Sequence, residues 1–481
     1  MRALVWFRSD LRILDNTALH HACKAADKGV IAVFAICAKQ WAEHDWGAMK
    51  VGFVLRNVRA LSEMLGKLSI PLLIVRASRF TNLPGKLLRL AVKRECDALF
   101  FNAEYEVNEQ RRDADVTALF ERHGRSVHKF TDQVILDAAG MRTGSGGFYT
   151  VFTPFKRKWL EWLEAEGPPR VRGKPRRQPR LDTPPDDVPA TLRGFAGRCR
   201  SDLWPEGEAV GRRRLCTFVL ERIERYHELR DIPAVDGTST LSPYLAAGVL
   251  SPRQCLHAAM EANRGRAGSG KKGITTWISE LIWREFYRHI LIGFPQVCMK
   301  RPFRMKTDRL PWRYDEDQFE AWCAGRTGVP IVDAGMRQLA ETGWMHNRLR
   351  MITAMFLTKD LFIDWRWGER HFMRHLVDGD FASNNGGWQW SASTGTDAAP
   401  YFRIFNPFSQ SRRFDPKGDY IRLFVPELEG ASEGKIHEPH KSESLGTDYP
   451  KPCVDHDTAR RITIKAFQGL SRRGSTRSRT S

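Results

Sequence analysis

Residues 30–36 read VIAVFAI, an unbroken apolar run, and this stretch decides the fold of the N-terminal part of the chain. A run of this length that is rich in β-branched residues is typical of a strand buried on both faces of a parallel sheet. Similar runs stand around it at 3–7 (ALVWF), 71–75 (PLLIV), 98–101 (ALFF) and 126–130 (SVHKF). Segments of helix length separate these runs, so we predict a doubly wound parallel α/β domain over residues 1–135.

The rest of the chain has a different pattern. The α/β domain lacks G-x-G-x-x-G after its first strand, so nothing marks it as a dinucleotide-binding half. Seven prolines fall between 168 and 189, which indicates an extended segment within an interdomain linker at 136–210. Beyond it, apolar residues recur with the helical period and predict an all-helical domain over 211–470. Residues 471–481 hold four Arg and no acid, and we expect a disordered basic tail.

Composition limits the possible classes of function. The 481 residues are 42% hydrophobic, and 76 Lys and Arg against 56 Asp and Glu give a formal net charge of +20. This excess favours a polyanionic partner such as nucleic acid, and a solvated basic surface is the alternative. The nine cysteines form no C-x-x-C pair, so we expect no disulfide and no zinc or other metal site. Since no signal-peptide or membrane-spanning run is present, we expect a cytoplasmic monomer without a membrane partner.

Two helical segments carry polar side chains among indoles. The first set shares one helix face: Trp277, Glu280, Arg284 and Tyr287. The second set is spaced in the same way: Trp344, Asn347, Arg348 and Met351. Each set fits either a cavity lining or buried indoles beside an exposed pair such as Glu280–Arg284.

A run of hydroxyl side chains precedes Pro243. It consists of Thr238, Ser239, Thr240 and Ser242. We predict that Ser242 is an N-cap with Pro243 at the first helical position. The N–H groups at such a helix start can bind phosphate, and a well-capped structural helix is the alternative.

The most informative stretch is 378–407, DGDFASNNGGWQWSASTGTDAAPYFRIFNP. It combines Asp378 and Asp380 with two amides, two glycines and two indoles, and it shows no hydrophobic period. We expect turn geometry with close backbone approach at 384–387. The composition favours the lining of a site over a packed structural element.

With these motifs the chain resembles the DNA photolyases of the cryptochrome/photolyase family, specifically the class I enzymes that act on cyclobutane pyrimidine dimers. The resemblance is carried by VWFRSDLRILDN (5–16), YEVNEQRRD (105–113), VFTPFKRKW (151–159), GTSTLS (237–242), ELIWREFYR (280–288), TGWMHNRLRM (342–351) and the 378–407 stretch. It implies a doubly wound α/β domain joined by a long linker to an all-helical FAD-binding domain. It also implies repair of dimers in UV-damaged DNA by an electron from light-excited FADH⁻.

The resemblance also implies the roles of individual residues. Those expected at the flavin are Tyr226, Thr238, Ser239, Thr240, Leu241, Ser242, Trp277, Arg350, Asp378, Gly379, Asp380 and Asn384. Asn384 would accept a hydrogen bond from flavin N5–H, and Arg350 would pair with Asp378. Those expected at the lesion or the DNA are Arg230, Glu280, Trp283, Arg284, Asn347, Arg348, Met351, Trp390 and Gln410. Trp388, Trp365 and Trp312 would form an electron-hopping chain that re-reduces the flavin.

An antenna chromophore is the remaining implication of the resemblance. His44, Asn108 and Glu109 match positions that hold 5,10-methenyltetrahydrofolate in the folate-type relatives. Met299 stands where some relatives have Lys, so a deazaflavin is the alternative antenna.

Three other functions compete with dimer repair. One is a cryptochrome-type blue-light photoreceptor, which Asn384, Glu280 and Met351 disfavour. Another is repair of the (6-4) photoproduct, which would place histidines where this chain has Asn347 and Met351. The third, from a different class, is a flavin-independent nucleic-acid-binding protein.

Overall fold

The computed structural model describes residues 1–197, 199–441 and 448–475, and the chain forms two compact units. The first unit comprises Met1–His227, Ser239–Pro295 and Val377–Asp380. The second unit comprises Glu228–Thr238, Gln296–Leu376 and Phe381–Ser481. The division into functional domains at 1–135, 136–210 and 211–470 stays a prediction.

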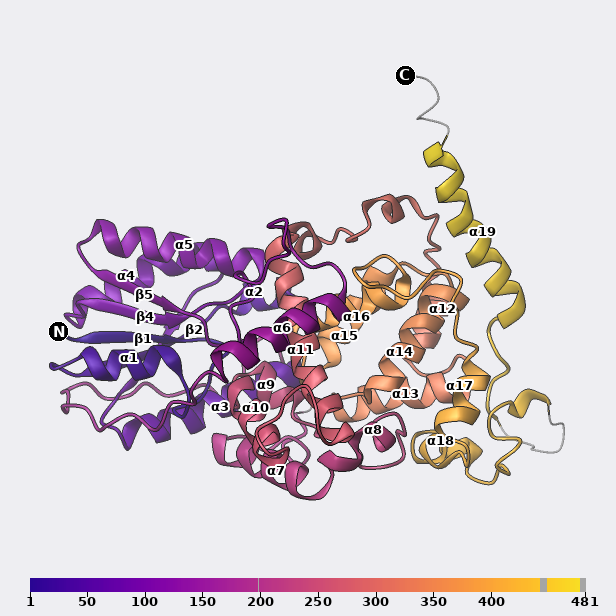
Figure 1. Ribbon diagram of the computed structural model, residues 1–481, viewed down its shortest axis with the longest axis horizontal. Helices are drawn as coiled ribbons and strands as arrows, with labels where there is room; N and C mark the ends of the chain where they lie inside the picture. Colours follow the sequence, from indigo (N-terminus) through magenta and orange to yellow (C-terminus); the bar gives the residue numbers. More distant parts are fainter. Residues whose placement is uncertain (198, 442–447, 476–481) are drawn as a thin grey trace. The chain divides into compact units, whose positions relative to one another are not determined.

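The first unit contains a sheet and the helices around it (Figure 1). Its strands are β1 (Ala3–Phe7), β2 (Val30–Ile36), β3 (Leu72–Arg76), β4 (Ala98–Asn102) and β5 (Ser126–Phe130). Its helices before residue 200 are α1 (Thr17–Ala25), α2 (Ala38–Glu43), α3 (Ala48–Gly66), η1 (Phe80–Asn82), α4 (Leu83–Lys93), α5 (Val107–Arg122) and α6 (Phe152–Glu166). Its later helices are α7 (Glu208–Glu221), η2 (Ile223–Arg225), α9 (Ser242–Ala246), α10 (Pro252–Ala262) and α11 (Lys272–Gly293), and α8 (Tyr226–Leu229) crosses into the second unit.

The sheet has five parallel strands in the order β3-β2-β1-β4-β5. In its centre, Val5 of β1 pairs with Ala32 of β2 and with Phe100 of β4. Figure 1 shows α1 and α3 on one face and α4 and α5 on the other. Because helices cover both faces, the central strands β1 and β4 are buried along their whole length, as their apolar sequences require. The predicted doubly wound α/β class is confirmed.

The predicted linker contains both irregular and regular structure. Residues 168–189 form no helix or strand, because their prolines lack the N–H group that either element needs. Helix α6, however, lies within 136–210 and buries Phe155 and Trp159. Trp159 donates from Nε1 to Glu285 of α11 at 2.8 Å, so this helix is fixed to the helical part of the first unit.

A buried cluster of ions joins the loop after β1 to the start of α10. We call it the ion-pair cluster, and its members are Arg12, Asp15, Asp132 and Arg253. Arg253 bonds Asp15 at 2.9 Å and Asp132 at 2.6 Å, and Arg12 pairs with Asp132. Each side chain is at most 3% exposed. Burial alone would raise the pKa of Asp132, but Arg12 and Arg253 outweigh it and lower that pKa to about 2.

The second unit is helical in the part of it that the structure describes. Its elements are η4 (Met305–Arg309), α12 (Glu316–Cys323), α13 (Pro330–Thr342), α14 (Asn347–Met355), the π-helix η5 (Phe356–Asp360), α15 (Trp365–His375), α16 (Phe381–Ala392), α17 (Pro407–Phe414), α18 (Asp419–Phe424), η6 (Pro426–Leu428), η7 (Pro439–Lys441) and α19 (His456–Ser475), and η3 (Pro295–Met299) begins in the first unit. One hydrophobic cluster, which includes Trp312, Trp322, Trp365 and Trp388, forms its core. The predicted helical class of the C-terminal part is thereby confirmed.

Three local predictions need correction or qualification. Trp344 does not share a helix with Asn347, because α13 ends at the left-handed Gly343 and His346 caps the next helix. Residues 384–387 form no turn, since they lie inside α16. Helix α19 reaches Ser475, within the predicted basic tail, and residues 476–481 lie outside the described part of the chain.

A search of the described residues finds no helix that combines the length and the apolar character needed to cross a bilayer.

The ion-pair cluster generates a stability prediction. Replacing Asp132 with Asn leaves two buried guanidinium groups without full compensation, so the free energy of unfolding should fall by about 3–5 kcal/mol. Because the folded pKa of Asp132 lies below its unfolded value, its contribution should be complete above about pH 5 and lost as the pH falls toward 2. Urea denaturation across this pH range measures both effects.

The control is Glu161→Gln, which removes an exposed pair with Lys158. It should change the free energy of unfolding by about 0–1 kcal/mol. An equally small effect of Asp132→Asn would show that the ion-pair cluster contributes little to stability.

Candidate functional site

The residues expected at the flavin divide between the two units. Those in the first unit are Tyr226, Ser239, Thr240, Leu241, Ser242, Trp277, Asp378, Gly379 and Asp380, and those in the second are Thr238, Arg350 and Asn384. The proposed Arg350–Asp378 pair therefore joins two units and stays a prediction. Within its own unit, Arg350 donates from Nε to the carbonyl oxygen of Met345 at 2.8 Å.

Two of the flavin candidates pack against a buried aromatic ring in the first unit. The ring of Phe218 lies 5.9 Å from that of Tyr226 and 5.3 Å from that of Trp277. Helix α7 supplies Phe218 and α11 supplies Trp277, so two helices position these rings. Thr240 has a positive φ of 48° and accepts a hydrogen bond from Arg214 at 3.3 Å, which places a guanidinium next to the run of hydroxyl side chains.

The start of α9 differs from the prediction. Ser242 is the first helical residue and Leu241 is the N-cap, so the proposed capping role of Ser242 is wrong. Pro243 does lie in the first turn, where its fixed φ is favourable. Thr240, the residue before this N-cap, has a left-handed backbone conformation. The helix begins at Ser242, one residue earlier than predicted.

Two cations fix the 378–380 segment. Arg288 of α11 forms an ion pair with Asp380, and Lys50 of α3 donates to the carbonyl oxygen of Gly379 at 2.6 Å. Burial lowers the pKa of Lys50 to about 8, although Asp380 and nearby glutamates act in the opposite direction. Sequence reasoning missed Lys50, because its position in an ordinary amphipathic helix gives no signal of this contact.

Helix α16 presents Asn384 in a fixed orientation. Its Nδ2 donates to the carbonyl oxygen of Glu369 at 3.0 Å, so the amide oxygen points the other way as an acceptor. The carboxylate of Glu369 accepts from Asn385 at 2.8 Å, and Gln389 donates to Asn385 at 2.9 Å. Glu369 of α15 thus accepts hydrogen bonds from the amide side chains of Asn384 and Asn385 in α16. These bonds explain why a sequence that is typical of turns forms a helix here.

The three indoles of the proposed electron chain are all buried in the core of the second unit. Trp388 is 2% exposed, Trp365 is 1% exposed and Trp312 is 7% exposed. Gly368 makes room for Trp388, since a Cβ at residue 368 would lie 2.1 Å from the Cη2 atom of that indole. The outer end of an electron chain must be accessible to a reductant in solution, and the low exposure of Trp312 does not provide this access.

The lesion and DNA candidates on α11 lie in the first unit. Trp283 stacks on Phe152 with ring centroids 3.6 Å apart, while Glu280 is half-buried on the same helix. The guanidinium of Arg284 donates to the carbonyl oxygens of Gln133 and Leu245, and burial lowers its pKa to about 10. The DNA contact of Arg284 stays a prediction, since its guanidinium already bonds within the unit.

The remaining lesion and DNA candidates lie in the second unit. Arg348 and Arg230 meet at Asp231, at 2.9 and 3.8 Å. Asn347 is exposed, and its amide lies 4.0 Å from the sulfur of Met351. Trp390 of α16 and Gln410 of α17 are both half-buried. The structure thus brings together two of the arginines and, separately, the Asn347–Met351 pair.

His346 is a neighbour of this group that sequence reasoning missed. It is 2% exposed and caps α14 by accepting from the N–H of Arg348 at 3.1 Å. Burial, together with Arg348 and Arg350, lowers its pKa to about 4, although Asp231 opposes them. His346 is therefore neutral at physiological pH and acts as an uncharged cap between arginines.

The structure brings the three antenna candidates together. The ring of His44 lies 3.0 Å from the amide of Asn108 and 3.3 Å from the carboxylate of Glu109. Burial acts to lower the pKa of His44, but its hydrogen bond to Glu109 and the charge of that residue outweigh burial and raise it. The cluster joins α2 with the start of α5, at the carboxyl ends of the strands.

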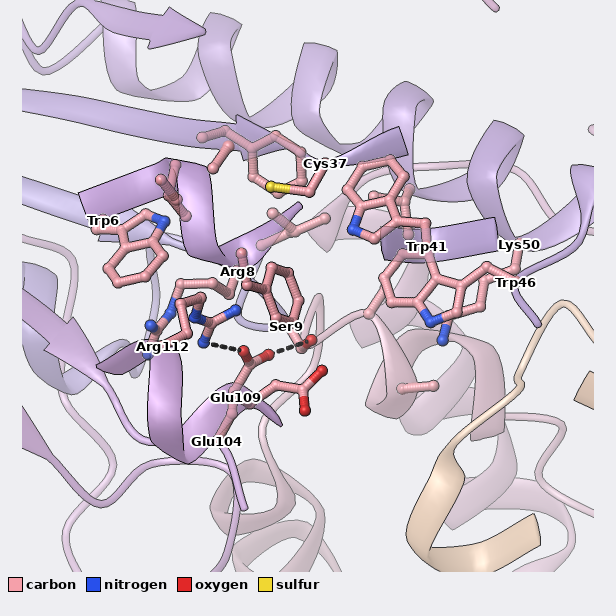
Figure 2. A pocket seen from close by; sticks show the side chains of 18 residues that line it. Trp6, Arg8, Ser9, Cys37, Trp41, Trp46, Lys50, Glu104, Glu109 and Arg112 are labelled. Atoms are coloured by element: carbon pink, nitrogen blue, oxygen red, sulfur yellow. Dashed lines mark hydrogen bonds and ion pairs between the residues drawn. The ribbon is translucent and has the colours of Figure 1, made fainter. Parts of the chain in front are cut away.

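A cavity of about 60 Å³ adjoins this cluster (Figure 2). It lies where the strand order changes direction around β1, the usual ligand position in doubly wound sheets. Figure 2 shows Ser9 and Arg112 directed at the carboxylate of Glu104. Both side chains donate to that carboxylate, and each hydrogen bond is 2.7 Å long. Burial would raise the pKa of Glu104, but Arg112 and Arg8 outweigh it and lower that pKa to about 2. Glu109 lines the cavity and also bonds His44, so it connects the cavity to the antenna candidates.

Comparison with known proteins gives consistent matches over almost the whole chain. Residues 277–469 match the family model described as FAD binding domain of DNA photolyase, and residues 3–175 match the DNA photolyase model. A deoxyribodipyrimidine photo-lyase of Salmonella typhimurium is 46% identical over 471 residues, covering 97% of this chain and 98% of that protein. A class III photolyase structure from Agrobacterium tumefaciens has a TM-score of 0.88 at 35% identity and covers 98% of both chains. A cryptochrome structure from Synechocystis has a TM-score of 0.86 at 28% identity, covering 96% of this chain and 98% of that one.

The close approach at Gly368 generates a prediction. Gly368→Ala places a methyl group against the rigid indole of Trp388, so the free energy of unfolding should fall by about 1–3 kcal/mol. The matched control is Gly387→Ala in α16, where a Cβ meets nothing within 4 Å. That change should raise the free energy of unfolding by about 0.5–1 kcal/mol, because alanine favours helix. Urea denaturation measures both, and destabilisation by neither or by both would contradict the packing described.

Proposed function

Because this chain belongs to the DNA photolyase family, we propose that it repairs cyclobutane pyrimidine dimers in UV-damaged DNA by light-driven electron transfer from reduced FAD. The observation that carries the proposal is the match of the FAD-binding model to 277–469, the segment that holds Glu280, Asn384 and the three buried indoles. Assignment to class I is part of this proposal.

The chemistry of the flavin candidates fits FAD. Tyr226, the hydroxyls in the 238–242 run and the guanidinium of Arg214 suit the diphosphate and ribityl region, and the buried indole of Trp277 suits a flat ring system. When bound, reduced FAD supplies the photo-excited electron that opens the cyclobutane ring and takes it back afterwards. The task of Asn384 is to accept a hydrogen bond at N5–H through an amide oxygen whose direction its bond to Glu369 fixes.

The lesion candidates would act on an extruded dimer. A damaged pair stacks poorly and is therefore easier to flip out of the duplex than an intact one. We propose that Glu280 hydrogen-bonds the pyrimidine edge, that Trp283 and Trp390 pack against the rings, and that Asn347 and Met351 complete the pocket. Arg230, Arg284, Arg348 and Gln410 would contact the DNA around it. Phe152 keeps the Trp283 ring in one orientation, which suits a stacking role.

The electron chain of Trp388, Trp365 and Trp312 is also part of the proposal. It is supported by their membership of one hydrophobic cluster. A monomeric state and a cytoplasmic location are further parts, to be tested by light scattering and by cell fractionation.

A cryptochrome-type photoreceptor is the second candidate, because a Synechocystis cryptochrome shares the fold at a TM-score of 0.86. Repair fits better, because Glu280 and Met351 would be needed only at a lesion. If flavin-loaded, chemically reduced protein binds damaged DNA but leaves dimers intact under blue light, the photoreceptor is the better assignment.

The direct test of repair uses Glu280→Ala. The loss of a charge-assisted hydrogen bond of about 1.5–3 kcal/mol should lower the light-driven repair rate by about tenfold or more. Flavin content, measured by absorbance of the purified protein, should stay near that of the unmodified chain. Glu261→Ala, an exposed change on α10, is the control for a general effect of losing a carboxylate. A parallel loss of repair and flavin would assign Glu280 a structural role.

For the antenna, we propose 5,10-methenyltetrahydrofolate at His44, Asn108 and Glu109. These three side chains already form one polar cluster, which supports folate. The adjoining cavity of about 60 Å³ is small beside ligand pockets of about 300–1,000 Å³, so either chromophore would require it to open.

A binding experiment separates the two antennas. Protein that contains flavin alone is mixed with the folate, and the bound folate is measured by its absorbance at about 380 nm. A bound deazaflavin would instead absorb at about 440 nm. Glu109→Gln should weaken folate binding, whereas Glu121→Gln, an exposed change on the same helix, should leave it unchanged. Uptake of a deazaflavin in preference to folate would overturn the proposed antenna.

A further inference from the structure

Five aromatic rings of the second unit form a continuous series from the core to the surface. The ring of Trp388 lies 6.0 Å from that of Trp322, and Trp322 lies 5.8 Å from Phe319. Phe319 lies 5.1 Å from Trp367, and Trp367 lies 5.8 Å from Tyr314. Each ring therefore contacts the next at a distance typical of packed aromatic pairs.

The two ends of this series differ in their access to solvent. Trp388 is 2% exposed, whereas Tyr314 is 64% exposed. Trp312, two residues before Tyr314, is only 7% exposed and packs against Phe362 at 4.9 Å. A reductant in solution can therefore reach the phenol of Tyr314 far more easily than the indole of Trp312.

We propose that Tyr314 is the solvent-facing end of a second electron-transfer route, which runs from Trp388 through Trp322 and Trp367 and is separate from Trp365 and Trp312. The route rests on the proposed function, in which Trp388 re-reduces light-excited oxidised flavin. Tryptophan and tyrosine are the most easily oxidised aromatic side chains, so each can be oxidised in turn and then reduced by the next ring. Phe319 is not oxidised and serves as the packed bridge between two indoles.

The electrons and the proton balance along this route. One electron passes from Trp388 to the excited oxidised flavin, and Trp322, Trp367 and Tyr314 each replace the electron lost by the ring before them. Tyr314 ends as a neutral radical after its O–H bond breaks. A thiol reductant in solution then returns one electron and one proton to that oxygen and is itself oxidised.

Asp364 is placed to receive the phenolic proton. Its Oδ2 atom accepts the hydrogen bond of the Tyr314 hydroxyl at 3.5 Å, and its carboxylate is held by Arg366 at 3.1 Å. Partial burial raises the pKa of Tyr314, and the charge of Asp364 adds to this effect, so the phenol is neutral at physiological pH. Oxidation of this phenol must therefore release a proton, and the exposed side chain also gives that proton access to water.

The test uses flavin-loaded, oxidised protein without DNA, frozen under blue light and examined by electron paramagnetic resonance. Growth on ring-deuterated tyrosine narrows any tyrosyl signal and so identifies it. The unmodified protein should show this signal, and both Tyr314→Phe and Trp367→Phe should lose it. Tyr401→Phe is the matched control, since that ring stacks on Phe467 and contacts Phe402. A tyrosyl signal that survives Tyr314→Phe would overturn the route.

Steady-state photoreduction gives a second readout. In Trp312→Phe the flavin should still be reduced under light with a thiol present, and adding Tyr314→Phe should abolish this residual reduction. Equal rates in the single and double variants would overturn the route. A repair assay on protein that has been reduced chemically with dithionite separates the two proposals. The Tyr314→Phe variant should repair dimers at the rate of the unmodified protein. Failure of the unmodified protein to repair dimers would count against the proposed function alone.

Discussion

The ion-pair cluster of Arg12, Asp15, Asp132 and Arg253 is the interaction on which the arrangement of the first unit depends. Two cations and two anions are buried together, so each charge is compensated within the cluster. Asp15 also accepts from Ser251, the N-cap of α10, and Arg12 donates to the carbonyl oxygen of Gly248 at 3.0 Å. A Cβ at Gly248 would lie 2.0 Å from the carbonyl oxygen of Ser9, so this junction is close-packed as well as charged. The cluster therefore holds helices α9 and α10 beside the carboxyl edge of the sheet.

A comparable constraint in the second unit acts through polar groups on the helix that carries Asn384. The amides of Asn384 and Asn385 would favour a turn if they were exposed. Glu369 satisfies both, one through its backbone carbonyl and the other through its carboxylate. Gly368, the residue before it, admits the indole of Trp388 against α15. One short segment of α15 thus sets the orientation of a flavin candidate and the position of the first indole in both proposed electron routes.

Sequence reasoning succeeded where a pattern reports directly on burial. The runs at 3–7 and 30–36 coincide with β1 and β2, because a parallel strand covered on both faces must be apolar throughout. The run at 126–130 coincides with β5, an edge strand that is largely exposed and contains Ser, His and Lys. Sequence reasoning failed where a tertiary contact overrides local preference. The NNGG stretch is typical of a turn, yet packing against α15 makes it helical. Trp344 has helical spacing to Met351, but the left-handed Gly343 separates the two helices.

By itself, the sequence determined the doubly wound sheet, the helical C-terminal part, the family and the identity of the candidate residues. The reason is that apolar periodicity and long motifs are properties of the local sequence. Only the tertiary structure decided which of these residues meet. It joined His44 to Asn108 and Glu109, committed Arg284 to backbone carbonyls, and buried Trp312 while leaving Tyr314 exposed. The physical reason is that hydrogen bonding and solvent exposure depend on neighbours far apart in the chain, about which local sequence carries no information.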